Sequence, residues 1–339
     1  MRIFNQIIWV LGLWLSLSAC QNEQAAIINV ADFGLHPGTK ENAVPVVIRA
    51  LERCKKYEKS VLVFNKGRYD FYFTLGNTRE YFESNTTNDA PKNLAILIEK
   101  CRQLTLEGNG AEFVFHGAIQ PVTIDNSENI SVQNVNIDWD IPLTAQAKVI
   151  AASPKNIDLE IDTRQFPYEV TDGKLVFRDD SWKAESHWFM EYEAATHRIA
   201  YRTGDNGCVR GDWSKYSVSE LGQGIARMNG EFSRVPKVGN YLILRHSKRD
   251  HAGIFIQESK NVKLENVNVF HCAGLGVLSQ FSRNLDYRNV KFMPNAAKNR
   301  YFSGHDDGFQ VSNCAGQVNI TNCEFGGLMD DPVNVHGTS

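Results

Sequence analysis

The chain has 339 residues, of which 42% are hydrophobic, so it is long enough to bury a large core. It carries 36 Lys and Arg residues against 39 Asp and Glu residues, a formal net charge of −3. This balance provides no attraction to a polyanion, so nucleic acid and anionic membrane surfaces are excluded as main partners.

The N-terminal segment has the pattern of an export signal. Arg2 supplies a positive charge, residues 7–17 form an apolar run too short to span a bilayer, and Leu17-Ser18-Ala19-Cys20 is typical of a bacterial lipobox. We expect residues 1–19 to be a lipoprotein signal peptide, Cys20 to carry the lipid, and residues 20–25 to be a tether. The mature chain is then expected in the periplasm or at the outer-membrane surface of a Gram-negative bacterium, with the lipid anchor as its only link to the membrane.

The next elements predict a cap for a larger β structure. Residues 28–30 and 61–64 read as strands, Asp32-Phe33-Gly34 as a turn, and residues 43–57 as an amphipathic helix. A turn at Lys66-Gly67 follows the second strand. This order resembles the opening element of pectate-lyase-like β-helix proteins, except that Asn65 stands where Pro is usual.

Four segments share one nine-residue pattern, with apolar residues at places two, four, seven and nine and Asn at place six. They are residues 129–137, 261–269, 284–292 and 317–325. The pattern predicts two short strands joined by a corner, with Asn134, Asn266, Asn289 and Asn322 stacked as a ladder of side-chain amides. A third strand precedes each segment, and the later copies begin at 253, 276, 308 and 332, in steps of 23, 32 and 24 residues.

Rungs of this size predict an all-β, right-handed parallel β-helix with an N-terminal helix cap, built from residues 26–141 and 241–339. Residues 142–240 interrupt the repeat with hairpin-like strands, which predicts an inserted antiparallel domain resembling a β-barrel. The last rung starts at Pro332 and the chain stops within it, so we expect a C-terminally truncated stack with an exposed edge. A 339-residue fragment of this kind is expected to aggregate or to be inactive on its own.

The remaining cysteines predict buried free thiols, because no CxxC or HExxH spacing offers a metal site. They are Cys54, Cys101, Cys208, Cys272, Cys314 and Cys323. We therefore expect no zinc site and, because no Ca²⁺-loop spacing is present, no other metal site.

Two pairs of acids, Asp306-Asp307 and Asp330-Asp331, lie just before third strands and are separated by 24 residues, the rung step at that point. The pairs are therefore expected to stack about 4.8 Å apart, where like charges raise the pKa of some of the carboxyl groups. One protonated and one ionised carboxyl group is what acid/base hydrolysis requires. Either pair alone could also be a turn or a Ca²⁺ ligand.

Other polar residues are expected around the acids. His251, His305 and His336 fall near the same column, and the longest rung adds a loop containing Arg300. We predict that these four residues bind substrate beside a catalytic cluster formed by both Asp pairs.

The motifs Gly304-His305-Asp306-Asp307-Gly308-Phe309 and Gly327 to Thr338 resemble glycoside hydrolase family 110, the exo-α-1,3-galactosidases. The resemblance implies a β-helix with barrel-like insertions, inversion at the anomeric carbon, no cofactor, and a galactose-terminated oligosaccharide or glycoconjugate as partner. It also implies that acid and base come from Asp307, Asp330 and Asp331, which leaves Asp306 as a supporting residue. Family members continue well beyond residue 339.

Two other functions fit a β-helix. A pectate lyase or polygalacturonase shares the scaffold, but a concentrated acidic patch repels a uronate substrate. A non-catalytic carbohydrate-binding adhesin would use the Asp pairs as corner residues or cation ligands. Release of free galactose from an α-1,3-linked disaccharide separates these functions.

Overall fold

The computed structural model describes residues 24–74, 77–86, 91–206, 215–222, 224–246, 248–249 and 251–337. The expected signal peptide, Cys20 and Cys208 lie outside these residues. The described part of the chain is mostly β structure, as predicted, and it contains no helix long and apolar enough to cross a membrane.

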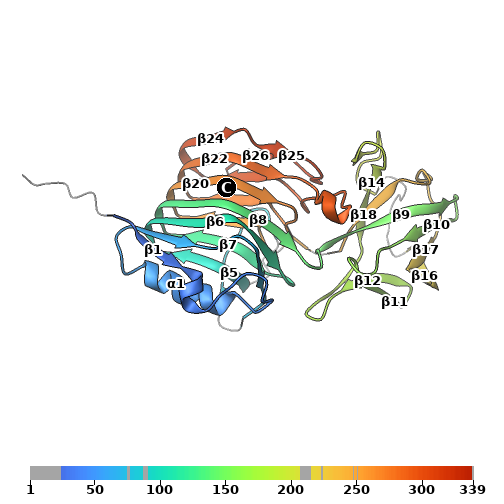
Figure 1. Ribbon diagram of the computed structural model, residues 1–339. Helices are drawn as coiled ribbons and strands as arrows, with labels where there is room; N and C mark the ends of the chain where they lie inside the picture. Colours follow the sequence, from blue (N-terminus) through green and yellow to red (C-terminus); the bar gives the residue numbers. More distant parts are fainter. Residues whose placement is uncertain are drawn as a thin grey trace, which may run out of the picture.

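Two sheets of parallel strands are stacked rung upon rung (Figure 1). The first runs through β1 (Ala26–Asn29), β2 (Ser60–Val63), β6 (Arg102–Phe115), β8 (Glu128–Trp139), β20 (Lys260–Val269), β22 (Arg283–Phe292) and β24 (Ala315–Thr321), with β3 (Arg68–Phe71) and β25 (Glu324–Phe325) beside β6 and β22. The second runs through β5 (Lys92–Glu99), β7 (Gln120–Asp125), β19 (Ile254–Gln257), β21 (Val277–Gln280), β23 (Phe309–Ser312) and β26 (Val333–His336). A short strand, β4 (Thr78–Arg79), pairs antiparallel with β5.

The register of these sheets agrees with the repeats in the sequence. Val267 of β20 lies between Val135 of β8 and Val290 of β22, the equivalent places of three repeats. All three side chains are buried, and they share one core with inward-facing residues of the second sheet such as Ile254. Each rung therefore buries its apolar face against its neighbours rather than within itself.

Asn residues mark the corners within the long strands. Asn134, Asn266 and Asn289 have φ values of 57°, 53° and 51°, a left-handed conformation that Asn tolerates better than most residues. Asn266 donates to Asn134 at 2.9 Å and Asn289 to Asn266 at 2.7 Å, which confirms this part of the predicted ladder. A second amide ladder, not predicted, joins residues 129, 261 and 284. These side-chain bonds hold equivalent bends one above another.

The N-terminal end carries the helix α1 (Val44–Cys54), which follows a single 3₁₀ turn at Val30–Phe33. The helix is three residues shorter at its C-terminus than residues 43–57, the predicted span. Val47, Ala50 and Leu51 are buried against the end of the stack, within the same core as the first strands. The five described cysteines among the six predicted free thiols are unpaired, and Cys54, Cys101 and Cys272 are buried.

Residues between β8 and β19 form antiparallel sheets that lie beside the stack (Figure 1). One sheet has the order β15 (Arg198–Ile199), β14 (Trp188–Glu193), β18 (Tyr241–Arg245), β9 (Thr144–Ala152), β10 (Asn156–Glu160), β17 (Ile225–Asn229) and β16 (Ser217–Gly222); the other joins β11 (Tyr168–Thr171), β12 (Lys174–Arg178) and β13 (Lys183–Glu185). We call residues 144–245 the inserted region. The predicted limit at residue 240 was too early, because β18 pairs with β9 and β14 and belongs to these sheets.

The long loop between β22 and β23 connects the two parts. It includes a 3₁₀ turn at Ala296–Lys298, and its residue Tyr301 stacks between His197 and Tyr241 with ring centroids 4.1 and 4.2 Å apart. Tyr301 and the next residue, Phe302, are buried in the apolar core of the inserted region. The loop that leads into the first Asp pair is therefore fixed by both parts of the molecule.

Candidate active site

The two Asp pairs lie in register on neighbouring rungs. Phe309 of β23 pairs with Val333 of β26, so the parallel register continued backward aligns Asp307 with Asp331. The backbone N–H of Gly308 donates to the carbonyl oxygen of Asp331 at 2.9 Å, which ties the two turns together. The stacking predicted from the 24-residue spacing is confirmed.

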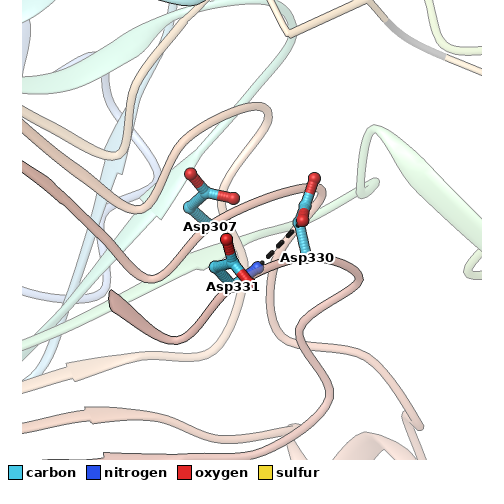
Figure 2. Close-up of side chains that lie close together, drawn as sticks. All are labelled: Asp307, Asp330 and Asp331. Atoms are coloured by element: carbon cyan, nitrogen blue, oxygen red, sulfur yellow. Dashed lines mark hydrogen bonds between the residues drawn. The ribbon is translucent and has the colours of Figure 1, made fainter. Parts of the chain in front are cut away.

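Three carboxyl groups converge at this place. One oxygen from each of Asp307, Asp330 and Asp331 lies within 4.8 Å of the others, and Figure 2 shows the three side chains gathered between the two turns. Asp307 is only 3% exposed, whereas Asp330 and Asp331 are open to solvent. We call these residues the acid triad.

The surroundings of Asp307 favour its protonated form. Burial raises the pKa of Asp307 to about 6, and the charges of Asp330, Asp306 and Asp331 act in the same direction. A hydrogen bond from Asn334 Nδ2 to Asp307 Oδ2, at 3.1 Å, opposes the rise. The site therefore contains one carboxyl group that can hold a proton near neutral pH beside two that face water. This is the pairing that acid/base hydrolysis uses.

The raised pKa predicts how stability depends on pH. The folded protein keeps the Asp307 proton up to about pH 6, while an unfolded chain loses it near 3.8, so the stabilisation from this proton is present at low pH and disappears as pH rises between these values. We expect Asp307→Asn to unfold with a free energy about 1–2 kcal/mol higher than wild type at pH 7.5, with no difference below pH 4, in urea titrations. Asp286→Asn, on the exposed side of β22, is the control. A gap for Asp307→Asn that does not change with pH would contradict the assignment.

Asp306 does not join the triad. Its side chain points to the inserted region, where Arg245 Nη2 donates to Oδ1 at 2.9 Å and His305 Nδ1 lies 2.7 Å from Oδ2. Burial raises the pKa of Asp306, but His305, Arg245 and Arg249 together hold it below its usual value. Asp306 therefore forms a buried ion pair with Arg245 and does not converge with the other three acids.

Of the predicted substrate-binding residues, Arg300 is held in a buried ion pair. Its guanidinium side chain is 0% exposed and donates to Asp138 at 2.6 Å and to the carbonyl oxygen of Trp139 at 3.2 Å. In this structure the guanidinium is closed to solvent and engaged by Asp138 and Trp139. Sequence spacing placed it in the right loop, but the direction of the side chain depends on Asp138 of β8.

The three histidines have different surroundings. His251 is buried, accepts from the backbone N–H of Asn93 at 3.3 Å, and has its pKa lowered to about 3 by burial and by Lys92, so it is neutral. It lies on the β19 rung, with β21 between it and the acids. His305 contacts Asp306, as described above. His336 is half-buried on β26, with Nε2 3.1 Å from Nε2 of Gln310. His336 is the one of these three histidines that lies on β26, the strand whose Asn334 donates to Asp307.

Sequence reasoning missed Asn334, Arg245 and Tyr192. Asn334 lies three residues after Asp331 in the same motif, and this place in the motif is the signal that could have found it. Arg245 and Tyr192 come from the inserted region, and no spacing in the sequence connects them to the acids. Tyr192 Oη donates to the carbonyl oxygen of Leu328, just before the second pair, at 3.0 Å.

Two cavities flank the turns that carry the acids. One of about 690 Å³ lies between the β14–β15 hairpin and the last turns of the stack, beside Tyr192, Met293 and Leu328. The other, of about 200 Å³, is bounded by Trp188, Arg249 and Asp306. The three acids line neither cavity.

The acid triad is also the one group of three His, Cys, Asp or Glu side chains, among the described residues, placed closely enough to hold a metal ion. Its oxygen ligands would suit a hard cation such as Ca²⁺ or Mg²⁺.

Known proteins resemble this chain both in the inserted region and over nearly its whole length. Residues 145–242 match the family model described as GLAA-B beta-barrel domain I, and these residues coincide with β9 to β18. Over almost its whole length, the chain is homologous to curated glycosidases.

These relatives are α-1,3-galactosidases. The chain is 44% identical to α-1,3-galactosidase B of Bacteroides thetaiotaomicron, over 95% of this chain and 53% of that protein. It is 32% identical to α-1,3-galactosidase A of Bacteroides fragilis, covering 96% and 54%, and to that of Shewanella woodyi, covering 91% and 51%. The chain spans about half the length of these relatives. The names of these relatives agree with the family that the two Asp motifs resemble.

Proposed function

We propose that this chain is part of an exo-acting glycoside hydrolase that removes terminal α-1,3-linked galactose from oligosaccharides or glycoconjugates. The observation that carries the proposal is Asp307, a buried carboxyl group with a pKa of about 6, placed beside the exposed Asp330 and Asp331. The homology to α-1,3-galactosidases A and B supplies the sugar and the linkage.

In this proposal Asp307 is the general acid. It protonates the glycosidic oxygen, because burial keeps its proton available where an exposed Asp has already lost it. Asp330 or Asp331, both open to water, acts as the base that activates the attacking water molecule. No cofactor takes part in these steps.

The proposed reaction inverts the anomeric carbon, which requires a certain distance between the acid and the base of the acid triad. Inverting enzymes separate acid and base by about 6.5–9.5 Å, more than the 4.8 Å that encloses the nearest oxygens here. Asp307 is fixed by Asn334, so the exposed base must turn away from it when galactose enters. Asp330 and Asp331 have the solvent-facing side chains that such a rotation needs.

The direct test is release of free galactose from an α-1,3-linked galactose disaccharide by the full-length protein. We expect galactose to appear from this substrate and not from its β-linked counterpart. No release from the α-1,3 linkage would overturn the proposed function.

Product stereochemistry tests the mechanism separately. Proton NMR during the first minutes of hydrolysis should show β-galactose before mutarotation mixes the anomers, because water attacks the face opposite the leaving group. The control is the mutarotation of pure α-galactose in the same buffer. Initial α-galactose would show retention, and it would fit the short spacing of the triad better than inversion does.

The alternatives predict other results in the same assays. A pectate lyase or polygalacturonase would cleave a uronate polymer, and a lyase that binds Ca²⁺ through the acid triad would lose activity in EDTA and regain it with Ca²⁺. We expect galactose release to survive chelation. A binding adhesin would retain a galactose-terminated glycan without cleaving it.

We further propose that the stack is a right-handed parallel β-helix capped by α1, that the inserted region is a barrel-like domain, and that domain limits lie near residues 26, 142 and 245. Parallel pairing throughout the stack and the separate apolar core of the inserted region support this division. Export as a lipoprotein through Cys20 is also a proposal, supported by the N-terminal sequence.

A further inference from the structure

Arg245 connects the inserted region to the turn that carries the first Asp pair. It is the last residue of β18, which lies between β14 and β9 in the antiparallel sheet. Its side chain is 5% exposed and leaves the sheet to reach the stack. Nε and Nη2 donate to the carbonyl oxygen of His305 at 3.1 and 2.6 Å, and Nη2 also donates to Asp306 Oδ1.

These bonds fix the backbone immediately before Asp307. The planar guanidinium holds a carbonyl group and a carboxylate at once, so it restrains both position and direction of the residue 305–306 peptide. His305 closes the arrangement from the other side of the Asp306 carboxylate. Asp306 thus acts as an attachment point, and the next side chain, Asp307, leaves the turn toward the triad.

The second acidic turn is held by the same region. Tyr192 of β14 is buried and donates from Oη to the carbonyl oxygen of Leu328. The next residue, Met329, packs in the apolar core of the inserted region, directly before Asp330. Both acidic turns are therefore attached to one antiparallel sheet, through neighbouring strands β14 and β18.

We propose that Arg245 and Tyr192 are positioning residues that set the geometry of the acid triad, so that the inserted region is part of the catalytic apparatus. The proposal rests on the proposed function for its kinetic consequences only. An error of about 1 Å in the placement of a catalytic group is enough to cost on the order of 10²-fold in rate. Neither residue touches the acids of the triad, so substrate affinity should change less than turnover.

The kinetic test compares Arg245→Gln, Arg245→Lys and Tyr192→Phe in the full-length protein. We expect Arg245→Gln to lower kcat on the order of 10²-fold with little change in KM. Arg245→Lys should recover part of the loss, because an ammonium group can bond one of the two partners but not both in the same geometry. Tyr192→Phe should lower kcat about 3- to 10-fold.

Arg227→Gln is the matched control. Arg227 lies in β17 of the same sheet and also bonds an Asp through Nε and Nη2, at 2.6 and 2.8 Å, but its partner is Asp158 of β10 rather than an acidic turn. It should leave kcat unchanged. Equal losses for Arg227→Gln and Arg245→Gln, or a loss confined to KM, would overturn the proposal. If Arg245→Gln does not fold, the kcat values of Arg245→Lys and Tyr192→Phe test the proposal instead.

Hydrogen–deuterium exchange tests the positioning without reference to activity. Two backbone hydrogen bonds join the first acidic turn to the second. The N–H of Gly308 donates to the carbonyl oxygen of Asp331, and the N–H of Ser303 donates to that of Gly327, each at 2.9 Å. We expect faster exchange in peptides covering residues 303–308 in Arg245→Gln, and none of this change in Arg227→Gln. Unchanged exchange would overturn the positioning role. If wild type releases no galactose but exchange responds as expected, the proposed function fails and the attachment of the turns stands.

Discussion

Asp307→Asn is expected to lower kcat for galactose release on the order of 10²-fold or more, the largest loss of activity of any single change considered. The substitution keeps the size of the side chain and its contact with Asn334, but removes the proton that the reaction transfers. Asp330→Asn and Asp331→Asn should each cause a loss of similar order, because one carboxylate activates the water and the charge of the other helps to raise the pKa of Asp307. Initial-rate measurements on the α-1,3-linked disaccharide give these values.

The control is Asp286→Asn, which replaces an acid on β22 that is paired with Arg288 away from the triad. Its kcat should equal that of wild type. Asp306→Asn should fall between these limits, since it weakens the attachment to Arg245 without removing a reacting group. If Asp306→Asn were as inactive as Asp307→Asn, the division of the first pair into one attachment residue and one catalytic acid would be wrong.

Asp138→Asn is expected to destabilise the fold by about 3–5 kcal/mol, the largest effect on stability. Asp138, near the end of β8, accepts from Arg300 at 2.6 Å, from Lys298 at 2.7 Å and from Asn295 at 2.9 Å. Without its charge, the fully buried guanidinium of Arg300 keeps its desolvation cost and loses its counterion. The midpoint of urea unfolding measures the change, and the loop that leads to Asp306 should be the first segment to lose protection from exchange.

The matched control is Asp158→Asn, which removes a carboxylate from an Arg partner whose side chain is 37% exposed. Water can solvate Arg227 after the change, so the expected loss is about 1 kcal/mol or less. Equal shifts for the two variants would mean that Arg300 finds water or another acceptor when Asp138 is neutral, and that the buried pair does not hold the loop.

Much of the architecture could be predicted from the sequence because each rung repeats the same pattern of alternating residues and Asn corners. A β strand alternates inward and outward residues, and Asn accepts the left-handed corner, so the positions of Asn134, Asn266 and Asn289 predict both the bends and the register. The 24-residue spacing of the Asp pairs then predicts that they stack, since parallel strands in register bring equivalent residues together.

The exact composition of the site was decided only by tertiary structure. Asp306 and Asp307 are neighbours of the same type in the sequence, but Arg245 holds Asp306 in an ion pair, whereas burial raises the pKa of Asp307. Arg245 is about 60 residues away, in a region that interrupts the repeat, so no periodicity could assign it.

The same limit explains Arg300. Its loop was predicted beside the acids, and it is there, but the direction of a side chain depends on the partners that surround it. Asp138 of an earlier rung binds the guanidinium in the interior, where its side chain is closed to solvent. Sequence periodicity by itself determined which rungs meet and which acids stack. Contacts between the stack and the inserted region decided which of those side chains are free to act, because burial and pairing are set by residues distant in the chain.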